Sequence, residues 1–190
     1  TSLQKRDFIG YRDLFFYISG VLEPFLNPRQ IKDWGIHKPA GIILYGPPGS
    51  GKIFWATKIA EIIGYKFKEI KRYYLSTTYV DGNKTTFNDF LVNMLKEQKT
   101  ALFLEDFDEI MLERNDENSV SAANLATQDV VLHHIGKFTS ENILMLGSAN
   151  SVADIEEEIL AAGRFDVLVP VFPPNAAERA EFILFSMLKD

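Results

Sequence analysis

The chain contains no cysteine and no long apolar run, and each absence excludes a class of protein. Without cysteine there is no disulfide framework and no thiolate zinc site, which fits a reducing compartment. No apolar segment approaches the roughly 18 residues of a membrane-spanning helix, and the opening TSLQKRDF lacks the apolar centre of a signal peptide. We therefore expect a cytoplasmic protein without a membrane span.

An excess of positive charge is also absent. The formal net charge is −6 at pH 7, which argues against non-specific nucleic-acid binding because a phosphate backbone attracts basic surfaces. With 190 residues, 46% of them hydrophobic, the chain suits one domain with a full core and room for a small appendage. It does not begin with Met, so we expect a piece of a longer protein.

Short apolar runs alternate with segments of helical periodicity. The predicted strands are GIILYG, YKFKEI, ALFL, NILMLGS and VLVPV. The predicted helices are Leu14–Leu26, interrupted near Pro24, then Lys52–Ile63, Thr86–Lys96, a helix within Asn118–Lys137, and one that begins at Asn175. This alternation predicts an α/β fold, in which helices cover both faces of a parallel sheet.

The segment GPPGSGKI, from Gly46 to Ile53, follows a predicted strand and opens a predicted helix. Gly46, Gly49 and Gly51 have no Cβ atoms to block a concave turn whose backbone N–H groups point inward at phosphates. The helix adds its N-terminal dipole, and Lys52 supplies a point charge for the outer phosphates. The sequence therefore predicts a phosphate loop that binds a nucleotide.

The last residue of this loop departs from the usual pattern. A phosphate loop normally ends in Ser or Thr, whose hydroxyl contacts Mg²⁺, and Ile53 cannot supply that ligand. A water molecule can replace the hydroxyl, because Mg²⁺ retains waters readily. We expect nucleotide binding to survive and the geometry for hydrolysis to loosen.

Two adjacent acids follow the predicted strand ALFL. Glu105 and Asp106 leave that strand at the edge of the sheet where open α/β sheets bind ligands, beside the phosphate loop. One acid would position Mg²⁺, partly through water, and its neighbour could polarise the attacking water. We assign both acids to the metal and to catalysis.

These segments together resemble the classical clade of AAA+ ATPases over almost the whole chain. The segments that carry the resemblance are GIHKPAGIILYGPPGSGK, LFLEDFDEI, NILMLGSAN, ILAAGRFD and PNAAERAEFIL. The resemblance implies a P-loop NTPase fold with a five-stranded parallel sheet between helices. It places Asn150 at the sensor position, Arg164 in the turn that faces a neighbouring subunit, and Ile9 and Gly10 of the opening DFIG at the adenine base.

The resemblance also implies partners and boundaries. The family assembles into rings, commonly hexamers, that bind ATP or ADP with Mg²⁺ and remodel protein substrates. Tyr79 and Val80 of TYVDGN match the loop that grips substrate in the ring pore, although Asp81 is an extra residue before the glycine. Residues 1–174 would form the large nucleotide-binding subdomain and 175–190 the start of a helical lid. The nucleotide contacts we expect are Ile9, Gly10, Pro47, Pro48, Gly49, Ser50, Gly51, Lys52, Ile53 and Phe54.

Several departures from the family pattern leave the activity open. Glu105 precedes Asp106 where the family has Asp then Glu, and Ala161 stands where the family has the first of two arginines. One alternative is a motor module that hydrolyses ATP slowly, and the other is a nucleotide-binding pseudo-ATPase with a structural or regulatory role. A small P-loop kinase is disfavoured because Asn150 and the GRFD turn would serve no purpose in it. His133 and His134 have no second ligand cluster, so we expect them to pack in the core or at the surface.

Overall fold

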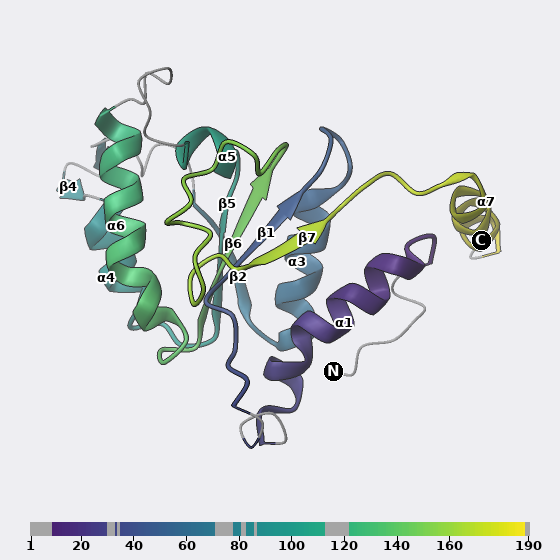
Figure 1. The fold of residues 1–190 in the computed structure, drawn as a ribbon, viewed down its shortest axis with the longest axis horizontal. Helices are drawn as coiled ribbons and strands as arrows, with labels where there is room; N and C mark the ends of the chain where they lie inside the picture. Colours follow the sequence, from purple (N-terminus) through teal and green to yellow (C-terminus); the bar gives the residue numbers. More distant parts are fainter. Residues whose placement is uncertain are drawn as a thin grey trace.

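The computed structural model describes residues 9–29, 33, 35–70, 78–80, 83–85, 87–112 and 122–188. Their elements, labelled as in Figure 1, are α1 (Arg12–Leu26), β1 (Gly41–Tyr45), α3 (Lys52–Ile63), β2 (Lys66–Ile70), β3 (Thr78–Val80), β4 (Asn83–Thr85), α4 (Phe87–Met94), β5 (Thr100–Leu104), α5 (Phe107–Ile110), α6 (Ala122–Phe138), β6 (Ile143–Ala149), β7 (Val167–Pro170) and α7 (Ala176–Met187).

Five of the strands form one parallel sheet in the order β2-β5-β6-β1-β7. The central strands β5 and β6 are buried along their whole length, whereas β2, with the sequence KFKEI, lies at one edge and is mostly half-exposed. The register aligns Leu104 with Gly147 and Tyr45 with Ala149, so β1, β5 and β6 end along one edge of the sheet. This confirms the predicted five-stranded parallel sheet.

Helices cover both faces of the sheet, as the sequence predicts (Figure 1). Alternate residues of β1 point to opposite faces, because side chains along a strand have a period of two. Ile42 and Leu44 join a core with α1 and α3, and Ile43 joins a core with α4, α5 and α6. The order of layers is therefore helix, sheet, helix.

Two features differ from the sequence-based expectation. Helix α1 is not interrupted at Pro24 but continues to Leu26. Pro24 lies in the last turn, where its missing N–H removes only one hydrogen bond near the helix end, and the ring is buried with Ile18 and Leu22. The antiparallel hairpin of β3 and β4 was not predicted.

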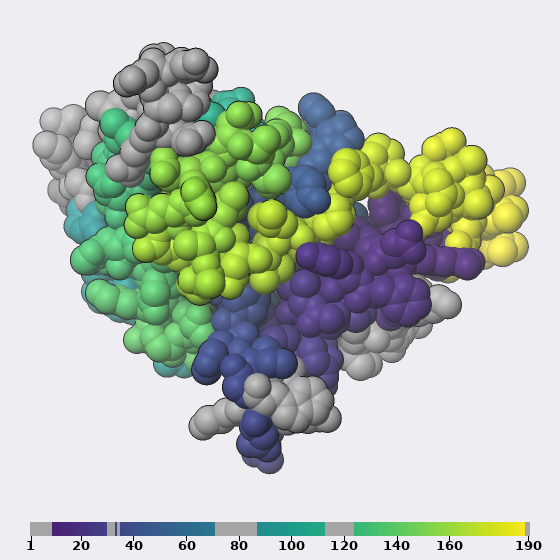
Figure 2. Space-filling view, in the orientation of Figure 1, coloured from purple at the N-terminus to yellow at the C-terminus, as the bar shows by residue number. Residues whose placement is uncertain are grey.

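The last helix, α7, stands away from the sheet. It begins with a capping box, in which Asn175 accepts from the Glu178 N–H at 3.0 Å and donates its own N–H to the Glu178 carboxylate at 2.9 Å. None of its residues is buried, and Figure 2 shows it projecting beside the first turn of α1. The helix predicted from Asn175 is thus confirmed. Among the described residues, no helix is both long and apolar enough to cross a bilayer.

Candidate nucleotide-binding site

The phosphate loop and the ends of β5 and β6 surround one hollow of about 370 Å³. They meet because β1, β5 and β6 are parallel and end at the same edge of the sheet (Figure 1). The hollow is lined by Pro48, Gly49, Gly51, Lys52, Ile53, Glu105, Asp106, Ser148, Ala149 and Asn150. Most of the predicted phosphate-side residues are therefore brought together.

The backbone of the loop takes conformations that favour glycine. Gly46, Gly49 and Gly51 have φ values of 152°, 76° and 88°. At Gly46 a Cβ atom would lie 2.1 Å from the carbonyl oxygen of Val171, so the close approach of that chain segment also excludes a side chain. Gly51 is the N-cap of α3 and provides no side-chain cap, which suits the binding of an anion by the first N–H groups of α3.

The ammonium group of Lys52 lies at the centre of the hollow's polar contacts. Its Nζ donates to the carbonyl oxygens of Gly46 at 2.8 Å and Pro47 at 3.1 Å, and to Oδ1 of Asn150 at 3.1 Å. These three acceptors are neutral, and a phosphate oxygen makes a stronger, charge-assisted hydrogen bond with an ammonium group. The loop, its glycines and Lys52 therefore fit a nucleotide phosphate.

The acidic pair is set by a sharp turn after β5. Asp106 has a left-handed backbone with φ of 52°, and its carbonyl oxygen accepts from the Glu109 N–H at 3.1 Å. Asp tolerates this region better than most residues. Glu105 is exposed and Asp106 is half-buried, and both line the hollow.

The residues of the hollow fit Mg²⁺ with two carboxylates and retained water. Glu105 and Asp106 are the carboxylates that line the hollow, and the side chain of Ile53, a residue that is 46% exposed, presents only carbon atoms. No group of three His, Cys, Asp or Glu side chains among the described residues could hold a metal without the nucleotide. When bound, Mg²⁺ supplies charge that stabilises the phosphate oxygens.

A third acid, Asp108, also belongs to this edge of the sheet. Its Oδ2 accepts from the backbone N–H groups of Asn150 at 2.7 Å and Ser151 at 3.0 Å. The sequence analysis missed Asp108. No local sequence signal identifies it, because the contact depends on β6 lying next to β5 in the sheet.

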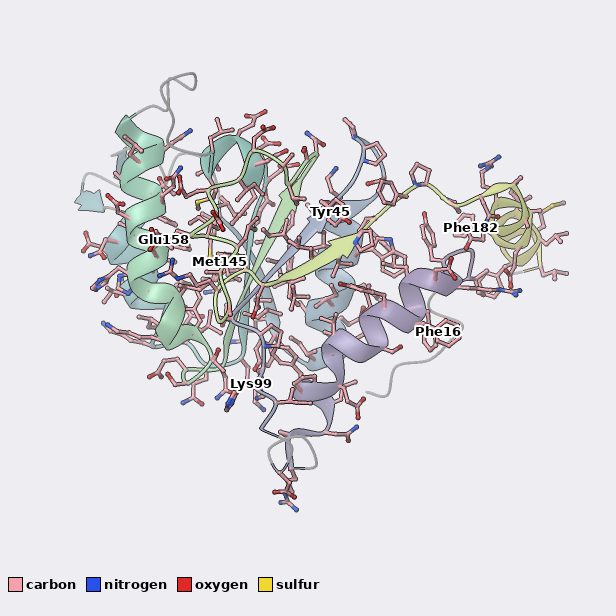
Figure 3. The ribbon with its side chains drawn as sticks, viewed as in Figure 1. Phe16, Tyr45, Lys99, Met145, Glu158 and Phe182 are labelled. Carbon is pink, nitrogen blue, oxygen red and sulfur yellow. The ribbon has the colours of Figure 1, made fainter. Side chains whose placement is uncertain are left out.

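Arg164 lies outside the residues that line the hollow. Its Nη1 donates to the carbonyl oxygen of Glu158 at 2.7 Å and forms an ion pair with Oε1 of the same residue, labelled in Figure 3, at 2.9 Å. The carboxylate of Asp166, two residues further on, accepts from the Gly163 N–H at 3.0 Å. Within one chain, Arg164 therefore contacts Glu158 in the loop before it and does not line the hollow with Glu105 and Asp106.

The residues predicted at the adenine base, Ile9 and Gly10, lie in the turn just before α1. Gly10 packs against α7, where a Cβ atom would approach the carbonyl oxygen of Glu178 to 3.0 Å, and Ile9 lines a separate hollow of about 840 Å³ against the same helix. Neither residue lines the phosphate hollow. Their contact with a base remains a prediction.

Phe54 lies between these two regions. It is 58% exposed, and its ring centroid is 5.1 Å from that of the buried Trp55. The ring of Tyr11 packs edge-on against Trp55 from the other side at 5.0 Å. Burial, and then the charge of Glu178, raise the pKa of Tyr11. These rings connect the start of α1 with the start of α3.

Two further predictions concern residues away from the hollow. Tyr79 and Val80 lie on β3, but their side chains, together with Asp81 and Gly82, are outside the described residues. His134 is buried, and its Nε2 lies 2.8 Å from Oδ1 of Asn88 on α4. Burial, and then the neighbouring His133 and Lys137, lower the pKa of His134, so it packs as a neutral core residue.

The fold and the loop define a P-loop nucleotide-binding domain. Residues 42–172 match the family described as "ATPase family associated with various cellular activities (AAA)". The match covers more than half of the 190 residues, and the chain belongs to the AAA family. This confirms the resemblance on which the sequence analysis relied.

Individual relatives are similar at low identity. The ATP-dependent zinc metalloprotease FtsH 2 of Thermoanaerobacter sp. (strain X514) is 24% identical over 183 residues, covering 96% of this chain and 36% of the relative. The 26S proteasome regulatory subunit 8 homolog of Encephalitozoon cuniculi (strain GB-M1) is 27% identical over 169 residues, covering 87% and 43%. The probable inactive ATP-dependent zinc metalloprotease FTSHI 1, chloroplastic, of Arabidopsis thaliana is 25% identical over 193 residues, covering 96% and 20%. The chain spans less than half the length of these relatives.

Proposed function

We propose that this AAA domain binds ATP and ADP with Mg²⁺ and couples binding, with slow hydrolysis, to the remodelling of a protein partner. The observation that carries the proposal is the position of Lys52. Its ammonium group lies between the phosphate-loop carbonyls and Asn150, in the hollow that Glu105 and Asp106 also line. A triphosphate placed there would meet the backbone N–H groups, one cation and the acids that hold its metal.

In this proposal each predicted residue has a distinct task. The loop from Pro47 to Gly51 and the first turn of α3, with Ile53 and Phe54, contact the nucleotide, and Lys52 binds its outer phosphates. Glu105 and Asp106 hold Mg²⁺, partly through water, and Asp106 also orients the attacking water. Ile9 and Gly10 contact the base, with α7, the start of a lid beginning at 175, beside them.

The proposed assembly is a ring of copies, hexameric as in the family. Arg164 would then face the nucleotide of the next subunit, and Tyr79 and Val80 would contact substrate in the pore. Support for the protein substrate comes from the relatives, since the names of two of them describe a protease and a proteasome subunit.

Hydrolysis is proposed to be slow for reasons of geometry. Ile53 offers no oxygen to Mg²⁺, and Asp106 is one methylene shorter than the glutamate that the family places there. An error of about 1 Å in positioning costs on the order of 100-fold in rate. Ala161 also removes one of the two arginines expected at a subunit interface.

The second candidate function is a nucleotide-binding pseudo-ATPase with a structural or regulatory role in an assembly. The contact that favours it is the pairing of Arg164 with Glu158, which holds the remaining arginine within its own chain.

Both candidate functions require nucleotide binding, and calorimetry tests it. We expect the full chain to bind ADP and ATP, and Lys52→Ala to abolish measurable binding. Lys58→Ala is a matched control, because Lys58 lies on the same helix but pairs with Glu61 at 3.3 Å, and it should bind as the parent does. Equal affinities of the Lys52→Ala variant and the parent would overturn the proposal.

Steady-state phosphate release then separates the two candidates. Slow release that Asp106→Asn abolishes supports the ATPase. Binding of ATP without any release above a protein-free blank supports the pseudo-ATPase.

A further inference from the structure

Asp108 connects the ends of two neighbouring strands. It belongs to α5, which follows β5, yet its Oδ2 accepts from the Asn150 N–H at 2.7 Å and the Ser151 N–H at 3.0 Å, both just after β6. Its Oδ1 is buried and receives no hydrogen bond from the part of the chain that the structure describes. The hydrogen bonds from the two N–H groups of this turn therefore compensate for the burial of the carboxylate.

The backbone that leads into Asp108 is fixed by a turn and by packing. Before it, the left-handed turn at Asp106 redirects the chain from the sheet edge, and Phe107 is fully buried against Phe165 with ring centroids 4.6 Å apart. A Cβ atom at Gly147 would lie 2.7 Å from the Phe107 ring, so this ring packs directly on the backbone of β6. Asp108 is thus held at the end of β6 by packing.

The turn that Asp108 holds carries Asn150, whose side chain accepts a hydrogen bond from Lys52. The amide oxygen of Asn150 accepts from Lys52 Nζ at 3.1 Å, so the amide NH₂ is the end that can donate to a phosphate oxygen. Backbone N–H groups of the loop bind the inner phosphates, which leaves Asn150 for the outermost one. The contact chain runs from Asp108 through the Asn150 backbone to Lys52.

We propose that Asp108 is a positioning residue that holds Asn150 at the outermost phosphate and thereby sets the preference of the site for ATP over ADP. The inference rests on the proposed nucleotide binding. Asp108 touches no nucleotide itself, so its whole effect passes through Asn150. Loss of its carboxylate lets the turn move, and the contact that only a triphosphate makes is weakened.

The test compares the affinities of ADP and of the non-hydrolysable β,γ-imido analogue of ATP, measured by calorimetry on the full chain. Asp108→Ala should weaken binding of the analogue by about tenfold, the effect of losing a hydrogen bond to a charged group, and change the ADP affinity by less than about twofold. Asp108→Asn keeps an amide oxygen for the two N–H groups and should retain the parental ratio. Asp154→Ala, which removes an exposed carboxylate from the same loop, should change neither affinity.

A double-mutant cycle decides whether Asp108 acts through Asn150. In an Asn150→Ala background, Asp108→Ala should have no further effect on the ratio of affinities. An undiminished effect in that background, equal losses for both nucleotides, or a ratio in Asp108→Asn that matches Asp108→Ala would overturn the inference. If the parent binds neither nucleotide, the proposed function fails, whereas parental binding with an unchanged ratio in Asp108→Ala rejects only the role of Asp108.

Discussion

The two sides of the hollow are built from different parts of the chain. The phosphate side is mostly backbone, made of glycines with positive φ and the start of α3, with Lys52 as its one charged side chain. The opposite side consists of the side chains of Glu105, Asp106 and Asn150, and we call it the reaction side because the proposed function assigns the reaction to these residues and to Arg164 of a neighbouring copy. Under the proposed function, the exchanged order of Glu105 and Asp106 and the loss of an arginine at Ala161 affect this reaction side, whereas Ile53 belongs to the phosphate side.

This difference separates binding from catalysis in physical terms. A backbone cradle is set by φ and ψ angles and by close packing, so it persists while flanking side chains change. A catalytic side is set by the length and direction of individual side chains, and small errors there reduce rates steeply. The domain can therefore retain nucleotide binding while losing turnover.

The largest effect on nucleotide binding and on stability is expected from a substitution on the phosphate side. Gly46→Ala places a Cβ atom 2.1 Å from the Val171 carbonyl oxygen at a φ of 152°, so it should abolish nucleotide binding. We expect it to lower the free energy of unfolding by about 3 kcal/mol. Gly49→Ala is the control for stability, because its Cβ atom meets no protein atom within 4 Å and adds only the strain of a positive φ, about 1 kcal/mol. Urea denaturation measures the stability of both variants and calorimetry measures the nucleotide binding of Gly46→Ala, and similar losses of stability in the two variants would contradict the steric argument.

The next effect concerns the order of the two acids. The double substitution Glu105→Asp with Asp106→Glu restores the family's order and adds one methylene to the proposed base. Phosphate release should rise on the order of 10-fold, because the carboxylate then reaches the attacking water. Each single substitution serves as a control. Turnover that stays at the parental level in the double variant shows that the order of acids does not limit the rate.

A smaller effect is expected from Ile53→Thr. The hydroxyl supplies a ligand to Mg²⁺, so the ratio of ATP affinities with and without Mg²⁺ should rise about fivefold, equivalent to roughly 1 kcal/mol. Ile53→Val is the control, since Val has the shape of Thr without the oxygen. Identical ratios for the Thr and Val variants would show that the hydroxyl does not reach the metal.

Sequence patterns were sufficient to predict most of the helices and strands, because the different local signals in each segment point to the same element. The helix from Lys52 to Ile63 has the expected boundaries, and the strand predicted as GIILYG ends one residue earlier, at Tyr45, since a buried run, positive-φ glycines and helical periodicity agree there. The hairpin of β3 and β4 was missed because each strand has only three residues, too few to show a period of two. Pro24 was wrongly given the effect that proline has in the middle of a helix.

Within the site, the sequence identified residues that carry motifs and missed those defined by contact between strands. The phosphate loop and the acids after β5 could be found from spacing alone. The bond from Asp108 to the Asn150 turn depends on β5 and β6 being neighbours, and strand order is not encoded in any local pattern. The pairing of Arg164 with Glu158 likewise depends on how the loop folds after Ile155.

The smallest effect on stability is expected from Arg164, and it tests whether the reaction side extends into a neighbouring subunit. The side chains of Arg164 and Glu158 are 30% and 60% exposed, so Arg164→Ala should lower the free energy of unfolding by less than about 1 kcal/mol. Glu158→Ala removes the same ion pair but keeps the arginine, so it should retain turnover, whereas Arg164→Ala should lose it.

A mixture of Arg164→Ala and Lys52→Ala subunits can form interfaces that pair an intact phosphate loop with an intact arginine, and these should recover turnover that neither variant has alone. A marked drop in melting temperature for Arg164→Ala, with no recovery on mixing, would instead assign this arginine to folding.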